Sequence, residues 1–158
     1  MKTRTACFGL ITLGVIAATG AAERLSFELL SGTEYRAELA ARTAPGSEFV
    51  LKSADPNAPT ITVRSPDRAA PIHSPVDIDA RFKAAKGATI NLASLKVLYG
   101  FLQLDVTRRI LDAPGVQVSA AGLKVNGARL ASGRHKLTIQ LADNFGRTGS
   151  QLLEFTIQ

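Results

Sequence analysis

Two aspartates and two histidines are the residues of this chain whose types and spacing come nearest to a chemical site. Asp77 and Asp79 stand two apart in an alternating segment, so both carboxylates would project from one face of a strand and could give calcium two oxygen ligands. His73 and His135 are the only imidazoles and could bind a transition metal. A small-ligand or metal-ion site would therefore use Asp77, Asp79 and His135.

Each of these residues also has a structural interpretation, which we prefer. Calcium takes about six to eight oxygens, usually gathered in one loop, whereas Asp77 and Asp79 alternate with Arg81 and Lys83 as a solvated strand face does. The only methionine is the initiator, which leaves a copper site without its sulfur ligand. We expect His135 to begin a strand with its ring half in water, and we predict no resident metal or cofactor.

No catalytic constellation is predicted, so we expect a protein that is not an enzyme. Neither histidine lies in a recognisable nucleophile motif, and GxSxG and GxGxxG are absent. The chain has no Trp and two Tyr, which argues against sugar binding by ring stacking. Cys7 is the sole cysteine and lies in the predicted leader, so disulfides and thiolate chemistry are excluded from the mature chain.

Residues 1–22 have the three parts of an export signal. Lys2 and Arg4 precede an apolar run over 8–18, and small residues end at Ala22. We expect cleavage before Glu23, no stable membrane span afterwards, and a periplasmic or secreted address in a bacterium.

The basic balance of the chain does not indicate nucleic-acid binding. The whole sequence carries +6, and loss of Lys2 and Arg4 with the leader leaves 17 basic residues against 13 acidic ones. Basic residues are scattered and almost no aromatic residues lie among them, so no base-stacking surface is predicted. We therefore expect no nucleic-acid partner.

Short alternating segments separated by turn residues run from about residue 60 to the end of the chain. The strongest pattern is the pair of strands flanking Asp143–Gly146, whose inward side chains would be Leu137, Ile139, Leu141, Leu153, Phe155 and Ile157. Further strands are expected at 61–63, 76–82, 95–99, 101–106, 116–119 and 123–125. A helical turn is expected at 108–111. Turns are expected at 65–67, 86–87, 113–115 and 126–127.

We predict an all-β fold, an antiparallel sandwich of about seven strands over 60–158. Residues 23–59 are an extension or linker of uncertain structure, which could join the sandwich, cap it or hang free. Within it, residues 34–42 fit a short helix, yet Tyr35, Ala37 and Leu39 alternate as a strand would. Two prolines in 53–59 place a boundary near that loop.

Residues 71–158 resemble the bacterial Ig-like domains of exported and surface proteins. The segments that carry the resemblance are Ile72–Pro75, Gly87–Asn91, Ser94–Val97, Asp105–Thr107, Leu130–His135 and Asp143–Gly146, in that order. The resemblance implies an Ig-like fold and an extracytoplasmic address, and little about activity.

The sequence thus favours a non-enzymatic exported module that binds an envelope or surface protein, with strand addition as a plausible mode. A small-ligand or metal-binding periplasmic protein is the alternative, and an accessory domain of an envelope enzyme complex is a third. The partner and the oligomeric state are left open by the sequence.

Overall fold

The computed structural model describes residues 25–43, 55–67 and 70–158 of the chain. The predicted leader, residues 1–22 with cleavage before Glu23, lies outside the described residues, as does the part of the extension over 44–54. No helix within the described ranges has the length and apolar character needed to cross a membrane.

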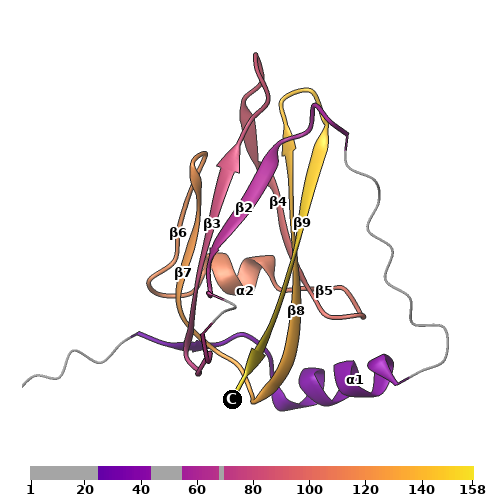
Figure 1. Cartoon of the computed structure of the whole chain (residues 1–158), viewed down its shortest axis with the longest axis vertical. Helices are drawn as coiled ribbons and strands as arrows, with labels where there is room; N and C mark the ends of the chain where they lie inside the picture. The colour runs from indigo at the N-terminus through magenta and orange to yellow at the C-terminus, as the bar shows by residue number, and fades with distance from the viewer. Residues whose placement is uncertain (1–24, 44–54, 68–69) are drawn as a thin grey trace, which may run out of the picture.

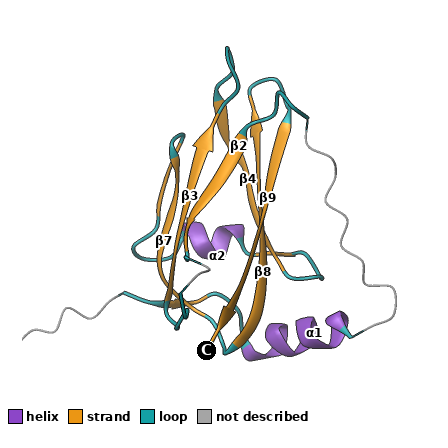
Figure 2. Cartoon of the chain, viewed as in Figure 1, coloured by secondary structure: helices purple, strands orange, loops and turns teal. Residues whose placement is uncertain are grey.

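Two β-sheets face each other, as the sequence predicts (Figure 1). Sheet A contains β1 (Phe27–Glu28), β2 (Thr60–Ser65), β3 (Val76–Lys83), β6 (Gln117–Ser119) and β7 (Gly122–Arg129). Sheet B contains β4 (Ile90–Tyr99), β5 (Leu104–Asp105), β8 (Gly133–Asp143) and β9 (Thr148–Ile157). The helices are α1 (Gly32–Arg42) and α2 (Thr107–Leu111), and Figure 2 shows that strands dominate the described chain.

The all-β sandwich prediction is therefore confirmed in its coarse form. About seven strands were expected, whereas the described residues contain nine. The strand without a predicted counterpart is β1, which has two residues and is too short to give an alternating pattern in the sequence.

Alternate residues of the central strands build the core between the sheets. In β3 the predicted alternation is observed, because the side chains from Val76 to Phe82 are buried at every second position. In β8, Leu137, Ile139 and Leu141 are at most 1% exposed. β8 also pairs with β4 on one side and β9 on the other, so its inward face is central to sheet B.

The turn at Asp143–Gly146 is confirmed and is fixed by a buried carboxylate. Asp143 is 1% exposed and accepts hydrogen bonds from the backbone N–H groups of Phe145 (2.9 Å) and Arg147 (3.0 Å). The Arg147 guanidinium lies 2.6 Å from the same side chain. Burial opposes ionisation, but these bonds outweigh it and hold the pKa of Asp143 below its usual range.

The described part of the extension joins the sandwich rather than hanging free. β1 pairs in parallel with the end of β7, and α1 follows at the lower end of the sandwich, near the start of β8 (Figure 1). A capping box begins α1, because Ser31 and Glu34 each bond the other's backbone N–H. This local signal favours the helix over the strand that the alternation also allowed.

Asn126–Gly127 is not the predicted turn but a bulge inside β7. The β3–β7 register shifts at this point, and Gly127 has a φ of 76°. The Asp77 carboxylate accepts the Gly127 N–H at 2.8 Å, and a Cβ at Gly127 would collide with the Leu25 carbonyl. The glycine is needed here because β1 approaches β7 closely, not because the chain reverses.

The strand predicted over 101–106 is also wrong in part, since only Leu104–Asp105 forms β5. The preceding residues turn instead, because the N–H groups of Phe101 and Leu102 are bonded to the side chain of Glu38. The helical turn expected at 108–111 is confirmed as α2.

Substituting Ile139 tests the placement of the core. Ile139 is 1% exposed and pairs with Val97 and Gln151. We expect Ile139→Ala to lower the free energy of unfolding by about 2–5 kcal/mol, and Ile139→Asp to abolish cooperative thermal unfolding because a charge would be buried without a partner. Circular dichroism melts measure both. Exposed Thr156→Ala is the control, and an unchanged midpoint for Ile139→Asp would show that the core is placed wrongly.

Candidate functional site

The ring of His135 lies at the junction of α1 with the sandwich. It is 0% exposed, so the expectation that it is half in water is wrong. The Tyr35 ring from α1 stacks on it at 5.8 Å between centroids, and the Phe155 ring from β9 stacks on it at 5.6 Å. The sequence indicated only that His135 lies near the start of a strand. The ring is buried because α1 and β9, which are distant along the chain, cover it.

Hydrogen bonds fix the ring of His135 at both nitrogens. Nε2 lies 2.7 Å from the Ala131 carbonyl and Nδ1 lies 2.6 Å from the Tyr99 hydroxyl. A carbonyl can only accept, so Nε2 carries the proton and Nδ1 accepts from Tyr99, as in the neutral ring. Burial lowers the pKa of His135 and raises that of Tyr99, because neither charged form is hydrated there.

Beside this ring, α1 inserts a carboxylate into the turn between β4 and β5. Glu38 is 0% exposed, and its two oxygens accept the N–H groups of Phe101 (2.7 Å) and Leu102 (3.2 Å). Arg42 pairs with the same carboxylate at 3.3 Å and donates to the Arg134 carbonyl at 2.7 Å. The buried charge is therefore compensated by a cation and two backbone donors.

A second ion pair holds the first turn of α1. The Arg109 guanidinium of α2 bonds both oxygens of Glu34, at 2.9 and 3.0 Å, and also the Leu29 carbonyl at 2.6 Å. The Arg109 bond and the Ser31 N–H lower the pKa of Glu34 to about 2. The docking of α1 thus depends on Glu34, Tyr35 and Glu38, none of which was singled out from the sequence; the Ser31-x-x-Glu34 capping box is a signal that could have marked the helix.

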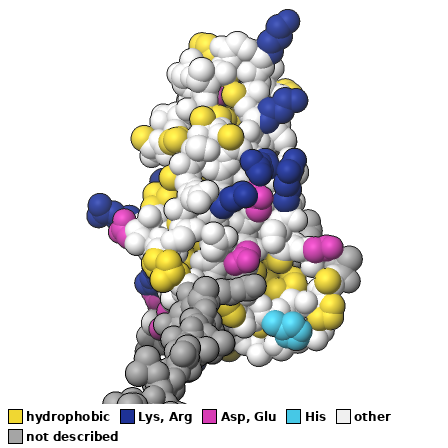
Figure 3. All heavy atoms as spheres, turned by 90° about the vertical axis from the view of Figure 1, so that its left-hand side faces the viewer, with side chains coloured by type: hydrophobic (Ala, Val, Ile, Leu, Met, Phe, Trp, Pro, Cys, Tyr) yellow, Lys and Arg dark blue, Asp and Glu magenta, His cyan; other side chains and the backbone are white. Residues whose placement is uncertain are grey.

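The weak metal candidates Asp77, Asp79 and His135 are each occupied by other contacts. Asp77 accepts the N–H of Gly127 from the outer side of sheet A, and Asp79 lies 3.3 Å from Arg81. Figure 3 shows this side of the molecule, where Lys and Arg side chains lie beside acidic ones. Across the described residues, no three His, Cys, Asp or Glu side chains gather as metal ligands would.

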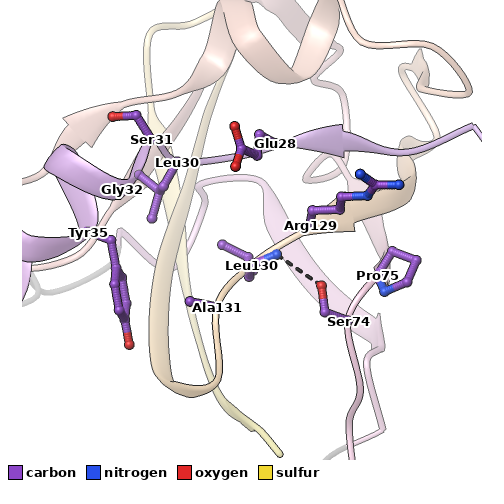
Figure 4. Close-up of a pocket in the computed structure, with 10 residues that line it drawn as sticks. All are labelled: Glu28, Leu30, Ser31, Gly32, Tyr35, Ser74, Pro75, Arg129, Leu130 and Ala131. Atoms are coloured by element: carbon purple, nitrogen blue, oxygen red, sulfur yellow. Dashed lines mark hydrogen bonds between the residues drawn. The ribbon is translucent and has the colours of Figure 1, made fainter.

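Several clefts open on the described surface. One of about 370 Å³ lies where β1 and α1 meet the end of β7, with Glu28 and Arg129 at its rim and Leu30, Leu130 and Tyr35 on its walls (Figure 4). In the same cleft the Ser74 hydroxyl accepts the Leu130 N–H at 3.1 Å. Its serines have no neighbouring histidine among the lining residues.

β9 is an edge strand whose outward backbone groups follow from its pairing with β8. The Asp143 N–H donates to the Arg147 carbonyl, and bonded pairs alternate along an antiparallel ladder. Odd-numbered residues of β9 therefore bond β8. The residues that direct N–H and C=O groups away from β8 are Ser150, Leu152, Glu154 and Thr156.

The end of this outward side is covered by another part of the chain. Near the start of β9, the Pro59 carbonyl lies against the inward face of the strand, where a Cβ on Gly149 would collide with it. At its end, the Gln158 N–H donates to the Ile72 carbonyl at 3.0 Å. Ile72 also forms a parallel β-bridge with Ile157, so the outward side is left open from Leu152 to the N–H of Thr156.

Within that open stretch, the side-chain amide of Gln151 donates to the Leu152 carbonyl at 2.9 Å. No neighbouring strand in the described part of the chain pairs with the outward groups of Glu154 or with the outward N–H of Thr156. A cleft of about 430 Å³ adjoins them and is lined by Pro71, Ile72, Phe155 and others. The open side of β9 thus offers backbone hydrogen bonds beside a partly apolar hollow.

Comparisons of the sequence with protein-family models, with curated proteins and with solved structures find no match. The functional argument below therefore depends on the residues and their geometry.

His135 should make stability depend on pH. Its folded pKa is lowered, so the unfolded chain binds more protons below the ordinary value of 6.5. We expect the thermal midpoint to fall as the pH decreases from about 7 towards about 5.5, a window above the range where carboxylates titrate. His135→Gln should flatten this dependence, whereas the exposed His73→Gln should leave it as in the wild type. Equal slopes in all three proteins would contradict the assignment.

Metal ions test the alternative use of the aspartates. Because Asp77 and Asp79 already contact Gly127 and Arg81, we expect about 1 mM calcium, zinc or copper to leave the thermal midpoint unchanged. The control is Asp77→Asn with Asp79→Asn. A rise in the wild type that this double variant lacks would restore the metal-binding hypothesis.

Proposed function

We propose that this protein is a non-enzymatic, exported Ig-like module that binds an extended segment of an envelope or surface protein along the open side of β9. The observation that carries the proposal is the outward N–H and C=O groups of Glu154 and the outward N–H of Thr156, which no neighbouring strand of the described chain pairs. A partner strand placed there would continue sheet B by backbone hydrogen bonding.

Strand order supports the Ig-like part of the proposal. In sheet A, β2, β3, β7 and β6 lie in that order, and in sheet B the order is β5, β4, β8, β9. Ig-type sandwiches place strands A, B, E and D in one sheet and C, F and G in the other. β5 would then extend the second sheet beside strand C, and β9 would be strand G.

The way the edge is built supports binding rather than simple exposure. Natural proteins protect edge strands with prolines, charges, bulges or covering segments. Here Ile72 covers one end and the Gln151 amide bonds the Leu152 carbonyl, while Glu154, which is 51% exposed, lies 3.5 Å from Lys136. The exposed side chain of Glu154 can move aside without disturbing the core, which leaves its backbone groups open to a partner strand.

Export supports an envelope partner. The predicted leader over 1–22 would deliver the chain outside the cytoplasm, where a cysteine-free mature domain needs no oxidation to fold. The absence of a catalytic constellation in the sequence favours binding over chemistry.

Glu154→Pro tests the edge. Proline removes the outward N–H of Glu154 and adds a ring on the partner's side, while the bonds of Leu153 and Phe155 to β8 stay intact. We would select displayed random peptides of about nine residues on the wild-type domain and measure their affinity for the variant. We expect selected peptides to bind Glu154→Pro at least about tenfold more weakly, because the bond to the Glu154 N–H is lost and the proline ring lies where the partner's backbone must approach.

The matched control is Glu154→Ala, which removes the charge and keeps the N–H group. It should bind the peptides as the wild type does, and bound peptide should slow amide exchange at Glu154 and Thr156 but not at surface positions of sheet A. Equal affinity of wild type and Glu154→Pro for every selected peptide would rule out strand addition at this edge.

A further inference from the structure

The cleft where β1 and α1 meet the end of β7 combines apolar walls with two charged side chains (Figure 4). Its volume of about 370 Å³ lies near the lower end of the range of small-molecule pockets, which is about 300–1,000 Å³. Leu30 and Leu130, each 8% exposed, supply the apolar surface. The cleft therefore has room for one small molecule that is partly apolar.

The two charged residues of the cleft do not neutralise each other. Glu28 and Arg129 are opposite each other in the parallel pairing of β1 with β7, and both line the cleft. Yet neither side chain forms an ion pair or a hydrogen bond with any other residue of the described chain. A carboxylate and a guanidinium group thus lie at one rim, and both are available to a ligand.

Ser74 adds a hydrogen-bond donor to the same cleft. Its hydroxyl oxygen accepts the Leu130 N–H at 3.1 Å, and its own hydrogen is donated to no other described residue. Figure 4 shows Arg129 and Ser74 towards one end of the cleft and Tyr35 towards the other. A ligand carboxylate beside Arg129 and Ser74 would leave the apolar part of the molecule over the leucine side chains.

Hydrogen bonds between the surrounding segments hold the cleft in shape. The Leu29 N–H donates to the Arg129 carbonyl at 3.2 Å, and the Tyr35 hydroxyl donates to the Ser132 carbonyl at 3.0 Å. The Arg109 guanidinium donates to the Leu29 carbonyl at 2.6 Å. A preformed cleft loses little conformational freedom when a ligand binds, which favours binding even by exposed polar groups.

The pair of opposite charges selects the chemistry of the ligand. A molecule with only a carboxylate would be repelled by Glu28, and one with only an amine would be repelled by Arg129. An α-amino acid carries both charges on one carbon at neutral pH, so it can satisfy both residues at once. An apolar side chain on that carbon would also cover Leu30 and Leu130.

We propose that this cleft binds a free α-amino acid with an apolar side chain. Glu28 accepts hydrogen bonds from the ammonium group, Arg129 and Ser74 donate to the carboxylate, and Leu30 and Leu130 contact the side chain. The cleft is separate from the open side of β9, and the inference does not depend on the proposed function.

Titration of the full-length protein with L-leucine and with L-phenylalanine, followed by the NMR shifts of the Leu30 and Leu130 amides, tests the proposal. We expect saturable shifts with a dissociation constant of about 1 mM or below for at least one of the two. Isocaproate and isopentylamine, which are leucine without its ammonium group and without its carboxylate, should bind at least about tenfold more weakly than leucine. Glycine, which lacks the apolar side chain, should also bind more weakly.

Two variants assign the charges. Arg129→Gln should bind the amino acid at least about tenfold more weakly, because its charge-assisted hydrogen bonds to the carboxylate are lost. Glu28→Gln should also bind the amino acid more weakly but should bind isocaproate more tightly than the wild type does, because the repulsion of its carboxylate is removed. This opposite pair of effects would not follow from a merely structural role of Glu28.

Arg64→Gln is the matched control, since it removes an exposed arginine outside the cleft and should bind as the wild type does. Unchanged thermal midpoints verify that the variants are folded, which is expected because the substituted side chains are exposed. No saturable shift with either amino acid, equal binding of leucine and its two single-charge analogues, or equal affinity of the wild type and Arg129→Gln would each overturn the proposal.

Discussion

The inward face of β8 is the feature on which the rest of this structure depends. Leu137, Ile139 and Leu141 fill the space between the sheets. His135, near the start of the strand, lies on the same inward face. An apolar side chain at that position would complete the core but could not bond Tyr99 and Ala131. The first buried side chain of this face is therefore polar, and the next one, two residues later, belongs to the apolar core. α1 packs on the polar end of the face.

Burial without solvation then determines the chemistry of the junction. His135 can stay neutral inside the protein because each ring nitrogen has a partner, whereas Glu38 stays compatible with burial because Arg42 and two backbone N–H groups surround it. These contacts are directional. They fix the position of α1 accurately while contributing less net free energy than an apolar interface of similar size, since water can replace most of them.

Most of the sandwich could be predicted from the sequence because alternation in β3, β8 and β9 reports directly which side chains face inward. The errors arose where a residue's conformation is set by a distant segment. Gly127 forms a bulge because Leu25 and Asp77 contact it, and the chain turns after Gly100 because Glu38 accepts the N–H groups of Phe101 and Leu102. The prediction that His135 is half in water was wrong for the same reason, since Tyr35 and Phe155, which cover the ring, lie far from it in sequence.

The open side of β9 and the turn that holds Glu38 differ in what each can bind. The open side of β9 offers backbone groups, and an extended segment of almost any sequence can bond to them. Selectivity there would depend on the shape of the adjoining hollow beside Ile72. The turn that holds Glu38 offers N–H groups that require an anion, so it discriminates by charge. Phe155 connects them, because it lines the hollow on one side and its ring stacks on His135 at the α1 junction. A strand bound at β9 that shifted Phe155 would therefore also change the support of Tyr35, and with it the docking of α1.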